Sequence, residues 1–203
     1  GVVDMNRKIG MIGAGINALA VVGFAVCMLL DVLFGCYFCS MFIAFSFVVM
    51  ISALVSLAAP ERKAAGYAAL AFAAAYAAII LLVYFTQLTT VRAGELTRQA
   101  RDLLDFQRMG LAFNLDLLGY ALMALSTFFA GFTIHPRCTP DRWLKALLMI
   151  HGVFFFSCLL LPMLGVFQAD GPAWVGVAAL EFWCVYFCPV AILSLLYFKR
   201  QGE

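Results

Sequence analysis

Six long apolar runs, each free or nearly free of charged residues, divide this chain. The runs are residues 9–33, 37–58, 64–90, 110–134, 146–168 and 172–198. Each exceeds the roughly 20 residues that an α-helix needs to cross about 30 Å of hydrocarbon. They are continuous and rich in Ala and Leu, without the alternation of a membrane β-strand. The pattern predicts an all-α integral membrane bundle of six transmembrane helices.

The longest polar segment, residues 89–110, joins the third and fourth runs. Apolar residues recur in it at helical spacing between Leu96 and Leu104, with charged residues elsewhere around the turn. This spacing predicts a short amphipathic helix on the outer surface. The helix serves either as a solvated connector or as a lid over an outward-facing pocket. The other loops are short, so we expect residues 1–203 to form a single transmembrane domain.

Composition and charge place the chain in lipid and orient it there. Hydrophobic residues make up 66% of the 203 and charged residues only 12%, whereas a soluble domain averages about 25% charged. With the N-terminus inside, most of the 13 basic residues fall in inner segments, which predicts that both termini are cytoplasmic. The inner basic residues are Arg7, Lys8, Arg62, Lys63, Arg137, Arg142, Lys145, Lys199 and Arg200. The net charge of +2 then reflects topology, and we expect no nucleic-acid partner.

One carboxylate stands in the middle of the sixth run, in the stretch VAALEFWCVYFCP (177–189). Glu181 is nine residues past Pro172, which places it about 14 Å along a helix, near the bilayer midplane. A charge there costs on the order of 2.5–3.5 kcal/mol unless a polar partner, a water-filled cavity or protonation offsets it. We therefore predict that Glu181 faces the bundle interior and contacts a ligand. Trp174, seven residues before it on the same stripe, is predicted to line the entrance.

Other polar residues from the first, third and fourth runs fall in the same outer half of the membrane. They are Asp31, Tyr84, Gln87, Asn114, Asp116 and Tyr120. Asp116 and Tyr120 are four residues apart and share a helix face. No Lys or Arg lies in any of the six runs, and this excess of acids suits a cationic or hydrogen-bond-donating ligand, or a proton site. The alternative interpretation is that these groups hydrogen-bond one another and hold the helices together.

The cysteines raise a second possibility. Cys36 and Cys39 form a CxxC at the predicted outer start of the second helix, where a thiol can become reactive. This motif between the first two spans resembles the quinone-linked disulfide-bond oxidases of bacterial membranes. Those enzymes have four spans and a second outer cysteine pair, and the loops at 89–110 and 167–172 contain no Cys. Packing of the thiols inside the bundle is therefore the favoured interpretation.

Two further resemblances concern the overall layout. HPRCTPDRWLKALLMIHG (135–152) is similar to the inner loop before the fifth helix in small uncharacterised six-span families of bacteria. That resemblance implies a bacterial inner membrane and brings no activity with it. Ala14 and Ala18 match the small-residue spacing in the vitamin-binding substrate subunits of energy-coupling-factor transporters. That resemblance implies a high-affinity outward-facing pocket and a partner transporter module.

These patterns favour a membrane protein that binds or transports a small molecule over a membrane enzyme. An enzyme would rely either on thiol chemistry at Cys36 and Cys39 or on acid–base chemistry at Glu181 and Asp116. HExxH, GxSxG and the phosphate-binding glycine motifs are absent, and we expect no cofactor and no metal. His151, expected about one turn into the fifth helix, is interpreted as structural. The expected partners are the lipid bilayer, a small ligand, and either another membrane protein or a second copy of the chain.

Overall fold

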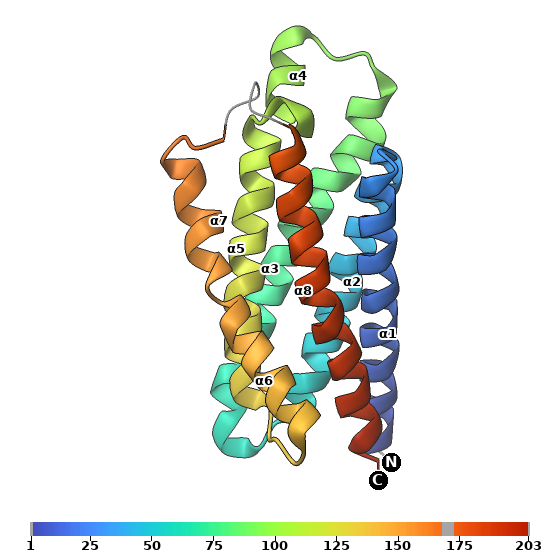
Figure 1. Ribbon diagram of the computed structural model, residues 1–203, viewed down its shortest axis with the longest axis vertical. Helices are drawn as coiled ribbons and strands as arrows, with labels where there is room; N and C mark the ends of the chain where they lie inside the picture. The colour runs from blue at the N-terminus through green and yellow to red at the C-terminus, as the bar shows by residue number, and fades with distance from the viewer. Residues whose placement is uncertain (1, 168–172, 203) are drawn as a thin grey trace.

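The computed structural model describes residues 2–167 and 173–202 and confirms the all-α, six-span prediction (Figure 1). Its α-helices are α1 (Val2–Leu29), α2 (Leu33–Leu57), α3 (Lys63–Thr86), α4 (Arg98–Leu104), α5 (Leu111–Thr133), α6 (Thr139–His151), α7 (Phe154–Met163) and α8 (Ala173–Arg200). A π-helical turn, Gln87–Val91, extends α3, and α6 and α7 together make the fifth span. Six such helices fit a polytopic membrane protein.

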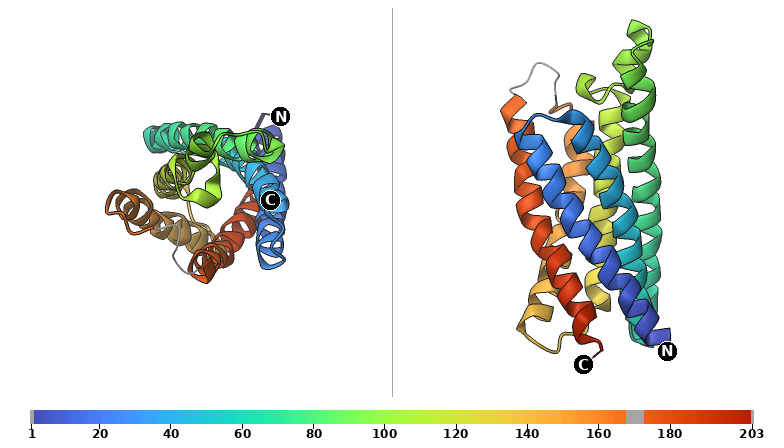
Figure 2. Two further views of the ribbon diagram at one scale, coloured as in Figure 1. Left: turned by 90° about the horizontal axis from the view of Figure 1, so that it is seen from above. Right: turned by 90° about the vertical axis from the view of Figure 1, so that its right-hand side faces the viewer.

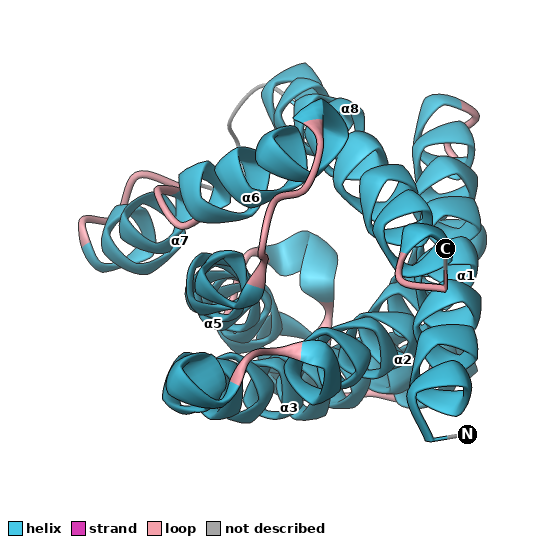
Figure 3. Ribbon diagram, turned by 90° about the horizontal axis from the view of Figure 1, so that it is seen from below, coloured by secondary structure: helices cyan, strands magenta, loops and turns pink. Residues whose placement is uncertain are grey.

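The helices form a ring when viewed along the bundle (Figures 2 and 3). In ring order, α1 packs on α2, α2 on α3, α3 on α5, and α5 on both α6 and α7; α8 closes the ring against α6 and α1. Both termini lie at one end of the bundle, which we call the termini end, and α4 lies at the opposite end, the loop end (Figure 1). The side of the membrane that each end faces stays a prediction.

The outer surface of the ring is apolar, as a lipid-facing surface must be. Leu19 on α1, Leu82 on α3 and Val185 on α8 are 75%, 64% and 72% exposed. Burying such side chains in hydrocarbon removes the cost of exposing them to water, about 25 cal/mol per Å². This belt supports the assignment of the six helices to a membrane.

Close packing of α1 on α2 depends on small residues in α1. A Cβ atom added at Gly13 would lie 2.9 Å from the backbone nitrogen of Met50, so a larger residue would push the helices apart. Gly10 likewise meets Ala53 and Phe198. Small residues let membrane helices approach closely, and here they bring α1 onto both α2 and α8.

The fifth span differs from the prediction in two ways. Helix α6 begins at Thr139 instead of residue 146, because Pro140 and Asp141 in its first turn are favourable helix-starting residues. The span is also broken at Gly152 and Val153, where the backbone hydrogen bonds run to the third preceding residue instead of the fourth. His151 consequently lies at the end of α6, about 18 Å from its start, and not one turn into the helix as expected.

Basic side chains at the termini end bind the carbonyl groups that helix ends leave unpaired. The Arg62 guanidinium donates to Ile134 O at 3.0 Å, at the end of α5, and Lys63 Nζ donates to Val55 O at 2.7 Å, near the end of α2. Arg200, in the last turn of α8, pairs with the buried Asp141 carboxylate of α6. The basic residues whose distribution predicts the topology therefore also supply hydrogen bonds to free carbonyl groups at helix C-termini.

Candidate ligand-binding site

Asp116 is the most enclosed carboxylate in the loop-end half of the bundle. It lies on the buried face of α5 with only 4% of its surface exposed, and its Oδ1 is buried without a hydrogen-bond partner. Helix α5 can bring it close to α3 because Gly119 leaves room for Ile80, 2.9 Å from where a Cβ would lie. Among the described residues no Lys or Arg forms an ion pair with it. One oxygen of the carboxyl group thus lacks the partner that normally accompanies such burial.

Aromatic side chains surround this carboxyl group. Tyr84 of α3 is 4% exposed and lies opposite Asp116. The rings of Tyr76 and Tyr120 are 5.8 Å apart, and Tyr120 in turn meets Trp183 of α8 edge-on at 5.4 Å. The Tyr76 hydroxyl is buried without a hydrogen-bond partner. The cluster combines an unpaired acid with ring faces and hydroxyls, a combination that suits a cation.

Glu181 lies on the opposite wall, on α8. It is half-buried, and its Oε1 is enclosed without a hydrogen-bond partner. Cys184, one turn closer to the termini end on the same helix, is buried near Tyr120 and Cys36. Residues three apart lie on neighbouring parts of one helix face, so Glu181 is on the side of α8 that adjoins the aromatic cluster. No hydrogen bond joins it to Asp116 within the described part of the chain.

The segment that joins α3 to α5 covers the aromatic cluster at the loop end of the bundle. Gln87 holds it there: its Nε2 donates to Leu104 O at 2.8 Å, and its Oε1 accepts from Phe106 N at 3.0 Å. The Phe106 ring packs against Tyr84 at 6.0 Å and also against Tyr37 and Phe113. Gln87 therefore fixes residues 104–106, which we call the plug, across the loop end of the bundle, where Phe106 packs over the buried Tyr84.

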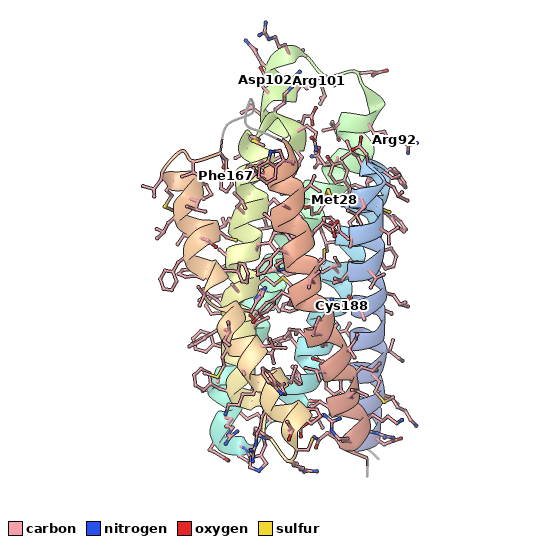
Figure 4. The ribbon with its side chains drawn as sticks, in the orientation of Figure 1. Met28, Arg92, Arg101, Asp102, Phe167 and Cys188 are labelled. Atoms are coloured by element: carbon pink, nitrogen blue, oxygen red, sulfur yellow. The ribbon has the colours of Figure 1, made fainter. Side chains whose placement is uncertain are left out.

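The predicted amphipathic helix exists as α4, but the helix as a whole does not seal the loop end. Its side chains are not buried, and Leu103 is 55% exposed. Arg101 and Asp102 stand clear of the bundle at its loop end (Figure 4). The sealing contacts come from its C-terminal end, through the carbonyl oxygen of Leu104, the last residue of α4, and from Phe106, which follows the helix.

Three of the predicted site residues lie away from the cluster. Asp31 is exposed in the turn between α1 and α2, with a left-handed backbone (φ 55°). Asn114 is exposed and lines a groove of about 340 Å³ between α5 and α7, together with Cys158 and Pro162. Trp174 is 70% exposed in the first turn of α8. The structure thus brings Tyr84, Asp116 and Tyr120 together, with Gln87 at the loop end and Glu181 on the facing wall.

One buried polar group that the sequence interpretation placed elsewhere lies just below the aromatic cluster. His151 is 1% exposed, and its Nε2 accepts a hydrogen bond from Trp183 Nε1 at 3.1 Å. Its Nδ1 is 2.8 Å from Thr127 Oγ1, whose own hydrogen is donated to Ala124 O. These partners assign a neutral imidazole with the proton on Nδ1. The buried positions of α6 recur every three or four residues up to His151, which is the sequence signal for its inward orientation.

The two cysteines of the CxxC motif pack against neighbouring helices and do not lie on an exposed loop. Cys36 is 2% exposed and lies at the end of the first turn of α2, and both thiols are free. A Cβ at Gly23 of α1 would lie 3.0 Å from Cys39 Sγ, so the glycine makes room for this thiol. Burial of Cys36 removes the access that thiol–disulfide exchange at this thiol needs, and Cys39 is partly buried. Nowhere in residues 2–167 and 173–202 do three or more His, Cys, Asp or Glu side chains gather to hold a metal.

Comparison with known protein families, curated proteins and solved structures found no match to this chain. The resemblances to the six-span families, the disulfide-bond oxidases and the vitamin-binding subunits therefore stay predictions from short motifs.

Proposed function

We propose that this protein binds or transports a small cationic or hydrogen-bond-donating molecule, held by Asp116 with Tyr84 and Tyr120 beside it. The observation that carries the proposal is the Oδ1 atom of Asp116, buried in a membrane bundle without a hydrogen bond or an ion pair. Burying a carboxyl group without compensation costs several kcal/mol. A bound cation or donor would supply the missing partner, and release of the ligand would restore the cost.

The aromatic shell supports a cation in particular. Tyrosine and tryptophan ring faces attract a cation with about 0.5–2 kcal/mol each, more where water is excluded. Tyr84, Tyr76, Tyr120 and Trp183 provide such rings close to the acid. Glu181 on the facing wall would add a second negative group, which suits a ligand with more than one donor.

The plug at the loop end implies that the ligand does not diffuse freely to Asp116. Phe106 packs on Tyr84 and is fixed by the hydrogen bonds of its segment to Gln87. Entry from this end requires those hydrogen bonds to open and the segment to swing away. A site that is closed between binding events also keeps water from the buried acid, which strengthens its attraction for a cation.

The tryptophans offer a direct test. Trp143 and Trp174 are 62% and 70% exposed, whereas Trp183 is 7% exposed and touches Tyr120. A variant carrying Trp143→Phe and Trp174→Phe leaves Trp183, beside the site, as the single tryptophan, which can be excited selectively over tyrosine. In lipid nanodiscs this variant should show a saturable fluorescence change on titration with guanidinium, which offers charge and donors. Tetramethylammonium, which offers charge alone, separates the aromatic contribution from the hydrogen bonds.

Adding Asp116→Asn should weaken guanidinium binding by at least tenfold, about 1.4 kcal/mol. The matched control is Asn114→Ala, an exposed position two residues away on the other side of α5. It should leave the titration unchanged. If guanidinium and tetramethylammonium both fail to saturate the signal, or if Asp116→Asn binds as well as the parent, the proposal is wrong.

A further inference from the structure

A second hollow lies at the termini end, between the start of α3 and the facing parts of α5 and α6. Its volume is about 420 Å³. It is lined by Glu61, Arg62, Ala64, Ala65, Phe132 and Lys145. It lies at the opposite end of the bundle from the plug and shares no residue with the Asp116 cluster.

Within the described part of the chain neither Arg62 nor Lys145 forms an ion pair, although Glu61 lines the same hollow. In the described part of the chain, the ion pairs at this end join Asp4 to Arg7 and Lys8, and Asp141 to Arg200. Arg62 instead donates through one nitrogen to Ile134 O and Phe132 O, at 3.0 and 3.4 Å. These bonds fix its guanidinium at the end of α5 while other donors of the fork stay unused. Lys145 reaches the same hollow from α6.

Apart from Glu61, the rest of the lining is apolar, and the hollow lies at the termini end of the bundle. Ala64 and Ala65 form a low wall without long side chains, and the Phe132 ring is 39% exposed beside them. Tyr67 and Trp143, near the same end of α3 and α6, are 63% and 62% exposed. Exposed tyrosine and tryptophan are enriched where hydrocarbon meets the headgroups. The two cations therefore lie where a phosphate would be, with an apolar wall leading toward the hydrocarbon.

We infer that this hollow binds the phosphate of an anionic phospholipid from the leaflet at the termini end. Arg62 and Lys145 contact the phosphate oxygens, and the first part of an acyl chain runs over Ala64, Ala65 and Phe132. Glu61, exposed at the rim, accepts a hydrogen bond from a headgroup hydroxyl. Basic pockets between helices at a membrane surface are suited to lipid phosphates, and the guanidinium fork fits phosphate geometry. A soluble phosphate compound would make no use of the apolar wall.

Native mass spectrometry of the whole protein, released from mixed micelles, tests this inference. Phosphatidylglycerol should stay bound at least tenfold more than phosphatidylcholine or phosphatidylethanolamine of the same chain length. Lys145→Gln should reduce the retained phosphatidylglycerol severalfold, and Arg62→Gln should reduce it at least as much. Lys145→Gln is the decisive variant, because Arg62 also binds the end of α5 and its loss can disturb folding. Arg142→Gln, an exposed basic residue on the same helix but outside the hollow, is the matched control and should change nothing.

Three outcomes would overturn the inference. The first is equal retention of the charged and zwitterionic lipids. The second is an equal loss in Arg142→Gln and Lys145→Gln, which would mean diffuse surface charge instead of a site. The third is full displacement of the lipid by millimolar glycerol 1-phosphate, which would identify a soluble ligand. None of these outcomes bears on guanidinium binding at Asp116, so each proposal is tested independently of the other.

Discussion

His151 and Asp116 are buried in the same bundle to almost the same degree, at 1% and 4% exposure, yet their surroundings differ. Both ring nitrogens of His151 have a partner, one on α5 and one on α8. Asp116 keeps an enclosed oxygen without any. A complete network holds helices together, whereas an incomplete one weakens the fold. The difference indicates that the histidine centre belongs to the structure, and it supports our proposal that the aspartate centre takes a partner from outside the chain.

The largest expected effect is the difference in the free energy of unfolding between a variant at His151 and a variant at Asp116. His151→Ala should lower the free energy of unfolding by about 3 kcal/mol, because it leaves a cavity and strips Trp183 Nε1 of its acceptor. Asp116→Leu should change it by less than about 1 kcal/mol, or raise it, because the substitution removes a buried oxygen, Oδ1, that has no hydrogen-bond partner. Denaturant titration of both variants in the same detergent gives the ranking. A larger loss for Asp116→Leu than for His151→Ala would reverse the comparison.

The next effect concerns the plug above Asp116. Gln87→Ala removes two hydrogen bonds to the loop segment, worth about 1–3 kcal/mol together. Local opening should become roughly tenfold more frequent, and trypsin should cut after Arg98 or Arg101 correspondingly faster. Guanidinium should also associate faster in stopped-flow mixing.

Thr89→Ala is the control for the plug, because the Thr89 hydroxyl donates only to Phe85 O of its own helix. It should leave both rates as they are. Unchanged cleavage and association in Gln87→Ala would mean that the segment does not gate the site.

The smallest effect is expected at Glu181. Its carboxyl group is half-buried, so more of its charge is screened than that of Asp116. Glu181→Gln should weaken the binding of guanidinium and of tetramethylammonium by roughly threefold, because it removes a screened negative charge, while glutamine can still accept a hydrogen bond from guanidinium. The single-tryptophan titration measures both. A loss as large as that of Asp116→Asn would make Glu181 an equal partner in the site.

The six spans could be predicted because each depends on a local property, the length of an apolar run. The break in the fifth span could not, because LLMIHGVFFF reads as one continuous run. At Gly152 a Cβ would lie 2.9 Å from the Cβ of Phe128, so the break accompanies a contact with α5 that is remote in sequence. The start of α6 at Thr139 was missed because its first turn is polar, although Pro140 was a usable signal.

The candidate site was predictable only where residues share a helix face. Asp116 and Tyr120 are four residues apart, and both face the cluster. Asn114 was grouped with them by sequence proximity, yet a shift of two residues turns a side chain through about 200° to the other side of the helix. The bond between His151 and Trp183 joins two helices across 32 positions, and a single sequence carries no sign of such a pairing.

The central claim is that the carboxyl group of Asp116 receives the ligand directly. Solid-state NMR of protein labelled with ¹³C at the aspartate carboxyl groups, in lipid bilayers, observes that atom. The Asp116 resonance is assigned by its disappearance in Asp116→Asn. On titration with guanidinium this resonance should shift and saturate together with the Trp183 fluorescence, while the resonances of Asp31 and Asp141 stay in place. A fluorescence change that saturates while the Asp116 resonance does not move would contradict the claim.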